Sequence, residues 1–183
     1  SLGRGKLVPL NIDTIQAFSG RYNHSDIFAS ALGYSGPNEK FYESLRWGDL
    51  YFVFTIPEDD IYTEREALVA NSVLSNARKL VRVLEQEHSF SRNVFRFFFN
   101  GKGFEVFVSA VSMGVQPRMD LPEIYHSIAD DLSYEHDIEY LDMNVYGYRA
   151  VLRVNGTLHS KCSARVPRHK IELSYKEFTT LSV

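Results

Sequence analysis

The sequence has a single cysteine, Cys162, among its 183 residues. One cysteine can form neither an internal disulfide nor a cysteine-based zinc site, a pattern typical of proteins in a reducing cytoplasm. The six histidines are scattered without the spacing of metal ligands. Any catalytic metal in this protein would therefore have to be held by carboxylates.

Long hydrophobic runs and a strong charge of one sign are also missing. No apolar run approaches the roughly 18 residues of a membrane span, so we expect a soluble, cytoplasmic protein without a membrane partner. The net charge of -3 and the pI of about 6.1 argue against a surface that is basic throughout. A local basic groove is still compatible with these values.

Proline and glycine are sparse, with 6 and 11 residues, and no linker-like or repetitive stretch divides the chain. We therefore expect one domain over residues 11–183. The chain begins at Ser1, so residues 1–10 are interpreted as a flexible arm or a remnant of trimming. The 44% hydrophobic content, with 13 Phe and 11 Tyr, favours a sheet-rich fold with a large core.

Hydrophobic periodicity predicts the main elements. Continuous or alternating apolar patterns predict strands, and a hairpin turn is predicted at the sequence NGKG, residues 100–103. Apolar residues at steps of three and four predict helices. The expected strands are 49–56, 94–99, 104–110, 149–154 and 170–174, and the expected helices are 64–87 and 121–132. Together these indicate an α+β domain with a mostly antiparallel sheet and packed helices.

Four segments in order resemble the archaeo-eukaryotic DNA primase small (catalytic) subunit family. They are DIFASALGYSGPNEKFYESLRWGDLYFVFTIPEDDIY, FRFFFNGKGFEVFV, LDMNVYGYRAVLRVNGTLHSK and VPRHKIELSYKEF. The resemblance runs from about Asp26 to Phe178 and implies a primase-like domain. Members of this family carry out nucleotidyl transfer with two divalent metals, which hard carboxylate oxygens hold.

The resemblance places metal-binding carboxylates at positions 55, 57 and 142, where this chain has Thr55, Pro57 and Asp142. Strand alternation would aim positions 55 and 57 at one face. Glu105 stands where the family has a histidine. Only Asp142 retains an acid, so no metal site and no catalytic residues are expected here.

The resemblance implies that the phosphate-contacting cations are mostly retained. These are Lys102 in the hairpin turn, followed by Arg153, His159 and Lys161. Such a pocket can hold a nucleotide or backbone phosphate by charge-assisted hydrogen bonds without metal. We therefore expect a catalytically degenerate, primase-like accessory subunit of DNA replication or repair. Its expected partners are single-stranded DNA or primer-template, a nucleotide, and a primase subunit or another replication protein.

Two other interpretations stay open. An active primase or polymerase could use relocated carboxylates, Glu58, Asp59, Glu105 and Asp142, with Mg²⁺ or Mn²⁺. A scaffolding module would instead turn the basic residues toward an acidic protein surface. At the residue level, the acidic run 58–60 is also expected as a solvated loop that caps the following helix, and Asp142 as a turn cap.

Overall fold

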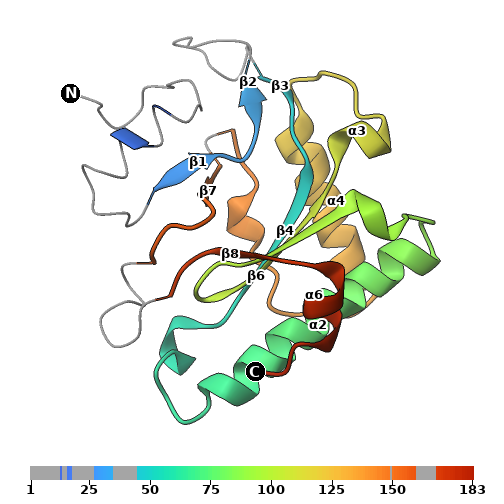
Figure 1. The fold of residues 1–183 in the computed structure, drawn as a ribbon. Coiled ribbons are helices and arrows are strands. Elements are labelled where there is room, and N and C mark those ends of the chain that lie inside the picture. Colours follow the sequence, from blue (N-terminus) through green and yellow to red (C-terminus); the bar gives the residue numbers. More distant parts are fainter. Residues whose placement is uncertain (1–12, 14–15, 18–26, 35–44, 149, 160–167) are drawn as a thin grey trace.

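The fold is taken from a computed structural model that describes residues 13, 16–17, 27–34, 45–148, 150–159 and 168–183. Its strands are β1 (Phe28–Ser30), β2 (Gly33–Tyr34), β3 (Leu45–Trp47), β4 (Leu50–Thr55), β5 (Phe95–Phe99), β6 (Gly103–Val108), β7 (Val151–Arg153) and β8 (Ile171–Leu173). Its longer helices are α2 (Glu66–Gln86) and α4 (Leu121–Glu135), and its shorter ones are α3 (Ala110–Met113) and α6 (Tyr175–Thr180). Figure 1 shows these elements around one central sheet.

The central sheet has the strand order β4-β6-β5-β8, and every neighbouring pair is antiparallel. A tight turn joins β5 to β6, where the Asn100 amide donates to the Gly103 carbonyl over 3.1 Å. Gly101 in this turn has φ of 97°, a conformation that glycine adopts without strain. Two short antiparallel ribbons, β1-β7 and β2-β3, lie outside this sheet.

The two faces of the central sheet follow from strand alternation, because paired residues point to the same side. One face carries Phe52, Phe54, Phe104, Val106 and Phe97, all of them buried. Helices α2 and α6 cover it, as the contacts of α2 with β6 and of α6 with β5 indicate. The opposite face carries Tyr51, Val53, Glu105, Phe107 and Phe98.

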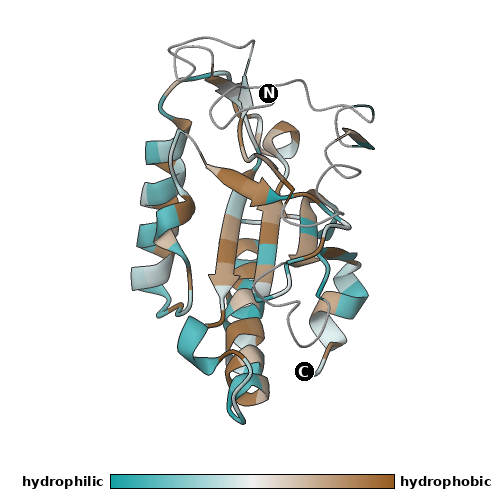
Figure 2. Ribbon diagram, turned by 90° about the vertical axis from the view of Figure 1, so that its left-hand side faces the viewer, coloured by the Kyte–Doolittle hydropathy of each residue, from teal (hydrophilic) through white to brown (hydrophobic). Residues whose placement is uncertain are grey.

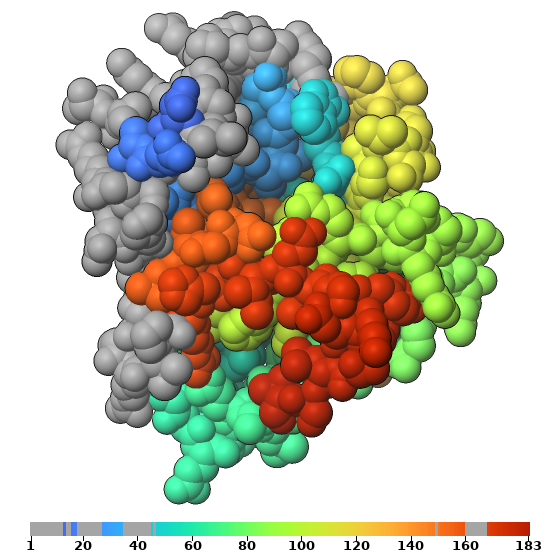
Figure 3. Space-filling view, in the orientation of Figure 1, coloured from blue at the N-terminus to red at the C-terminus, as the bar shows by residue number. Residues whose placement is uncertain are grey.

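The helices bury one side each. The buried residues of α2 recur at helical spacing: Val69, Ala70, Val73, Leu74, Ala77, Leu80, Val81, Val83 and Leu84. Helix α6 begins with a capping box between Ser174 and Glu177, and its Phe178 stacks on Phe97 with ring centroids 4.1 Å apart. Figure 2 shows hydrophobic residues concentrated on the central strands, and Figure 3 shows α6 in red beside α2 in green.

The structure confirms the expected α+β class, its antiparallel sheet and each predicted element, with ends shifted by a few residues. Two of the three phenylalanines at 97–99 are core residues, since Phe97 and Phe98 are 1% and 4% exposed. Residues 1–10 lie outside the described residues, and the single domain over 11–183 stays a prediction. Within the described part, no helix is both long and apolar enough to cross a membrane.

A substitution at Gly103 tests how closely β4 and β6 approach each other. A Cβ atom at this position would lie 1.9 Å from the carbonyl oxygen of Phe54, which is backbone and cannot rotate away. We expect Gly103→Ala to lower the free energy of unfolding by about 3 kcal/mol through overpacking. Urea unfolding measures this change.

The control for that experiment is Gly147→Ala, because nothing lies within 4 Å of the Cβ it would add. Its stability should stay within about 1 kcal/mol of the wild type. Equal stabilities of the two variants would show that β4 and β6 are not packed this closely.

Candidate functional site

The end of β4 and the segment around Asp142 lie side by side. The Thr55 amide donates to the Tyr140 carbonyl over 3.0 Å, and the Asp142 amide donates to the Val53 carbonyl over 2.8 Å. An isolated antiparallel bridge between Phe54 and Leu141 connects the same two segments. The fold therefore brings Asp142 next to Thr55, although the two are far apart in the sequence.

The Asp142 side chain is engaged as a turn cap. Its Oδ1 accepts from the backbone amide of Asn144 over 3.0 Å and from the Asn144 side-chain amide over 3.2 Å. It thereby caps the short 3₁₀ turn Met143–Val145. The turn-cap interpretation of Asp142 is confirmed.

Pro57 does not share a strand face with Thr55, in contrast to the prediction from alternation. β4 ends at Thr55, and the exposed Pro57 precedes the 3₁₀ turn Glu58–Asp60. Proline has no amide hydrogen to donate to a sheet, so a strand commonly ends before it. Within β4 the nearest residue on the face of Thr55 is Val53, which pairs with Glu105 of β6.

The acidic run 58–60 is solvated, as expected, but it does not cap α2. Glu58 and Asp59 are exposed, and the residue before the first turn of α2 is Arg65, with no side-chain cap. Glu58 instead accepts from Lys102 over 3.1 Å. Asp60 lies 3.8 Å from Arg65.

The four carboxylates of the relocated-site alternative have other contacts or lie apart. Glu58 contacts Lys102, Glu105 contacts Lys170, and Asp142 caps its turn. Among the residues that the structure describes, no three His, Cys, Asp or Glu side chains gather closely enough to hold a metal ion. This geometry does not favour the alternative.

Glu105 and Lys170 form a buried ion pair on the face opposite α2. The Lys170 ammonium donates to Glu105 Oε2, and Asn100 donates to Glu105 Oε1 over 3.1 Å. Glu105 is 2% exposed and Lys170 4%. The ammonium also lies 4.7 Å from the ring centroid of Phe98. Burial lowers the pKa of Lys170, and the neighbouring carboxylate opposes this shift.

Further cations come from the β5–β6 turn and from the segments 151–159 and 168–170, and we call Lys102, Arg153, His159, Arg168 and Lys170 the basic cluster. The His159 amide donates to the Arg168 carbonyl over 2.8 Å, and Leu158 and His169 form an antiparallel bridge. A Cβ added to Gly101 would lie 3.0 Å from that of His159. The turn that carries Lys102 is therefore packed against the segment that carries His159.

Most of the basic cluster has partners within the protein. Arg168 lies 2.5 Å from Glu66, which also accepts from the Tyr62 amide over 2.7 Å. Arg153 donates to the Leu158 carbonyl over 2.8 Å and lies 4.8 Å from the ring centroid of Phe28.

Solvent access differs sharply within the cluster. Arg153 and His159 are each 8% exposed, whereas the side chain of Lys102 is 21% exposed and its partner Glu58 is 65% exposed. The predicted phosphate contact Lys161 lies outside the described residues.

Lys170 and Glu66 were not predicted as site residues from the sequence. Strand alternation did place Glu105 on the face away from Phe104, and a carboxylate on an inner face needs a buried cation. The pattern gives no sign of which cation that is, because Lys170 is distant in sequence. Glu66 lies in the first turn of α2, where an acidic residue is common and signals no site by itself.

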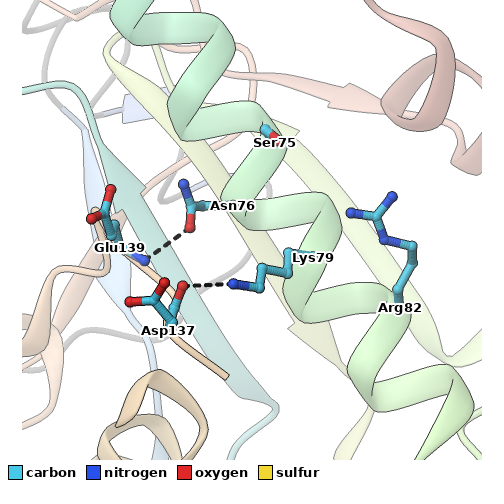
Figure 4. Close-up of a pocket in the computed structure, with 6 residues that line it drawn as sticks. All are labelled: Ser75, Asn76, Lys79, Arg82, Asp137 and Glu139. Atoms are coloured by element: carbon cyan, nitrogen blue, oxygen red, sulfur yellow. Dashed lines mark hydrogen bonds between the residues drawn. The ribbon is translucent and has the colours of Figure 1, made fainter. Parts of the chain in front are cut away.

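A polar depression of about 290 Å³ lies between α2 and the segment leading to Asp142 (Figure 4). Side chains of α2 in its lining bind that segment. Lys79 donates to the Asp137 carbonyl over 2.8 Å, and the Glu139 amide donates to Asn76 over 2.9 Å. Figure 4 shows the Lys79 side chain directed toward Asp137 and Arg82 directed away from it. The depression contains none of the predicted site residues, and its groups mainly hold this segment in place.

Comparison with protein-family models, curated proteins and solved structures finds no match to this chain. The candidate site therefore rests on the residues and contacts described above.

The buried pair predicts a specific pattern of stabilities. Lys170→Met leaves the Glu105 carboxylate buried without its cation, and we expect a loss of about 3–5 kcal/mol. The double variant Glu105→Leu, Lys170→Met removes both charges and should recover most of that loss. Urea unfolding of the single and double variants measures the coupling.

The matched control is Glu172→Gln, which breaks the exposed pair of Arg96 and Glu172 at 3.0 Å. An exposed pair contributes about 0–1 kcal/mol, so this variant should be nearly as stable as the wild type. A Lys170→Met variant no less stable than this control would refute the importance of the buried pair.

The contact between Glu66 and Arg168 predicts a loss of stability in acid. The hydrogen bond from Arg168 lowers the pKa of Glu66 below its ordinary value of 4.5. The folded state therefore gains stability from the ionised carboxylate above pH 4.5, and loses it as the pH falls through the lowered pKa. Glu66→Gln should be less stable than the wild type at pH 7, and this difference should shrink below pH 4.5.

Urea midpoints measured from pH 7 down to acid test this dependence. Glu64→Gln is the control, since Glu64 is exposed and lies just before the same helix. A stability difference for Glu66→Gln that stays constant across the series would contradict the assignment.

Proposed function

We propose that this chain is a catalytically degenerate, primase small-subunit-like domain that binds nucleic acid or a nucleotide as an accessory subunit in DNA replication or repair. One observation carries this proposal: three separate segments with the primase-like motifs meet at one end of the central sheet. Thr55 lies beside the Asp142 segment, and the Ile56 amide donates to the Lys102 carbonyl over 2.9 Å. The same turn contacts His159 through Gly101.

The site has cations for phosphate binding but few acids for metal binding. Transfer of a nucleotide needs two divalent metals held by paired carboxylates. Here Thr55 is neutral, Pro57 lies outside the strand, and Asp142 is the one acid at the three positions, where it caps a turn. A phosphate can still be bound by charge-assisted hydrogen bonds alone. Binding without catalysis is the function that this set of residues supports best.

Lys102 is the cation best placed to meet a phosphate. Its partner Glu58 is largely exposed, and an ion pair of this kind contributes only about 0–1 kcal/mol. A nucleic-acid phosphate can therefore replace Glu58 at small cost. Arg153, His159 and Lys170 are buried, so they shape the site more than they present charge to a ligand.

The expected ligands are single-stranded DNA or primer-template, and the expected protein partner is a primase subunit or another replication protein. Lys102→Ala should weaken binding to a single-stranded oligonucleotide and reduce the slope of log K against log salt by about one. Fluorescence anisotropy across a salt series measures both quantities. Lys176→Ala, which removes an exposed lysine on α6, should leave them unchanged.

Two outcomes would count against this proposal. No salt-dependent binding to single-stranded DNA would favour a scaffolding module that contacts acidic protein surfaces. Robust synthesis on a template with nucleotides and Mg²⁺ or Mn²⁺, lost in Asp142→Ala, would instead show an active enzyme with relocated carboxylates.

A further inference from the structure

A second depression lies between the start of α4 and the segment after Asp142. Its volume is about 320 Å³, near the lower end of the range for small-molecule sites. The lining residues are Pro122, Glu123, His126, Tyr146, Gly147 and Tyr148. None of them belongs to the basic cluster, so the depression is a separate feature of the surface.

The aromatic part of the lining is held firmly. Tyr146 stacks on Tyr51 with ring centroids 5.3 Å apart, and its hydroxyl donates to the Tyr51 carbonyl over 2.7 Å. His126 meets the Tyr146 ring edge-on at 5.9 Å. The Tyr34 hydroxyl donates to the carbonyl of Tyr148, which fixes the backbone there.

The carboxylate of Glu123 is oriented by a neighbouring hydroxyl. The Tyr148 hydroxyl donates to Glu123 Oε1 over 2.6 Å. This contact raises the pKa of Tyr148 to about 12. A tyrosine hydroxyl is protonated at neutral pH even without this shift, so it can donate to Glu123 there. A carboxylate has about four acceptor positions, so most of them remain open to a ligand.

We propose that this depression binds a guanine base, with Glu123 accepting from its Watson–Crick edge and an aromatic side chain beside its ring. Guanine presents two adjacent donors, N1–H and the N2 amino group, which match the two oxygens of one carboxylate. Such charge-assisted, bidentate hydrogen bonds are among the strongest in proteins. Stacking on aromatic side chains is the usual second contact for an unpaired base.

Other ligands match this lining less well. Adenine and cytosine place a ring-nitrogen acceptor beside their single amino group, and that acceptor would face the carboxylate. A quaternary ammonium ligand is bound by several open aromatic faces. Here one face of Tyr146 is already covered by Tyr51.

The inference goes beyond the proposed function, because free GMP can be bound without any contact to the basic cluster. Isothermal titration calorimetry with GMP and AMP tests it on the whole chain. We expect the wild type to prefer GMP over AMP. Glu123→Gln should weaken GMP binding by roughly tenfold or more and abolish the preference, because an amide cannot accept both hydrogen bonds.

Two further variants separate the parts of the site. Tyr148→Phe keeps the ring and loses the contact with Glu123, so GMP binding should weaken less than in Glu123→Gln. Glu139→Gln removes a carboxylate from the depression on α2 and should leave GMP binding unchanged.

Three results would overturn the inference: no binding of GMP at millimolar concentration, equal binding of GMP and AMP, or unchanged GMP binding in Glu123→Gln. The salt-dependent binding of DNA by wild type and Lys102→Ala tests nucleic-acid binding at the basic cluster separately, so the two failures can be told apart. Circular dichroism of each variant shows whether it has folded.

Discussion

The ion pair of Glu105 and Lys170 is the interaction on which the second face of the sheet depends. A carboxylate in the middle of β6, 2% exposed, would be strongly destabilising without a cation. Lys170 supplies that cation, and its amide also donates to the Thr157 carbonyl over 3.0 Å. The pair thereby fixes the segment at 156–159 over the sheet. His159 lies in this segment, and Arg153 donates to the Leu158 carbonyl within it.

A second constraint acts on the segment that leads to Asp142. Asp137 and Tyr140 both have positive φ, 49° and 65°, which is strained for a bulky residue such as tyrosine. The contacts of Lys79 and Asn76 with this segment offset the strain. Helix α2 therefore supports the sheet on one side and holds the Asp142 segment in register with β4 on the other.

Much of the fold could be predicted from sequence, because local patterns determine it. The alternation in 104–108 and the helical spacing in 66–86 each mark one buried face, and NGKG marks the turn. The site was less predictable, because it depends on pairs distant in sequence. Lys170 is buried against Glu105, which is 65 positions away in the sequence. Strand alternation was extended to Pro57, which lies beyond the end of β4 at Thr55.

The charges at the site limit how strongly it can bind nucleic acid. Lys102, Arg168 and Lys170 each face a carboxylate of this chain, namely Glu58, Glu66 and Glu105. A phosphate must therefore displace an internal acid, and only the pair of Lys102 and Glu58 is exposed enough to exchange readily.

Proteins that bind DNA tightly through charge neutralise many phosphates at once. With one readily exchangeable cation among these three and a net charge of -3, the chain would bind nucleic acid weakly by itself. Weak intrinsic binding suits the proposed role as an accessory subunit, because a partner that also binds the nucleic acid raises its effective local concentration.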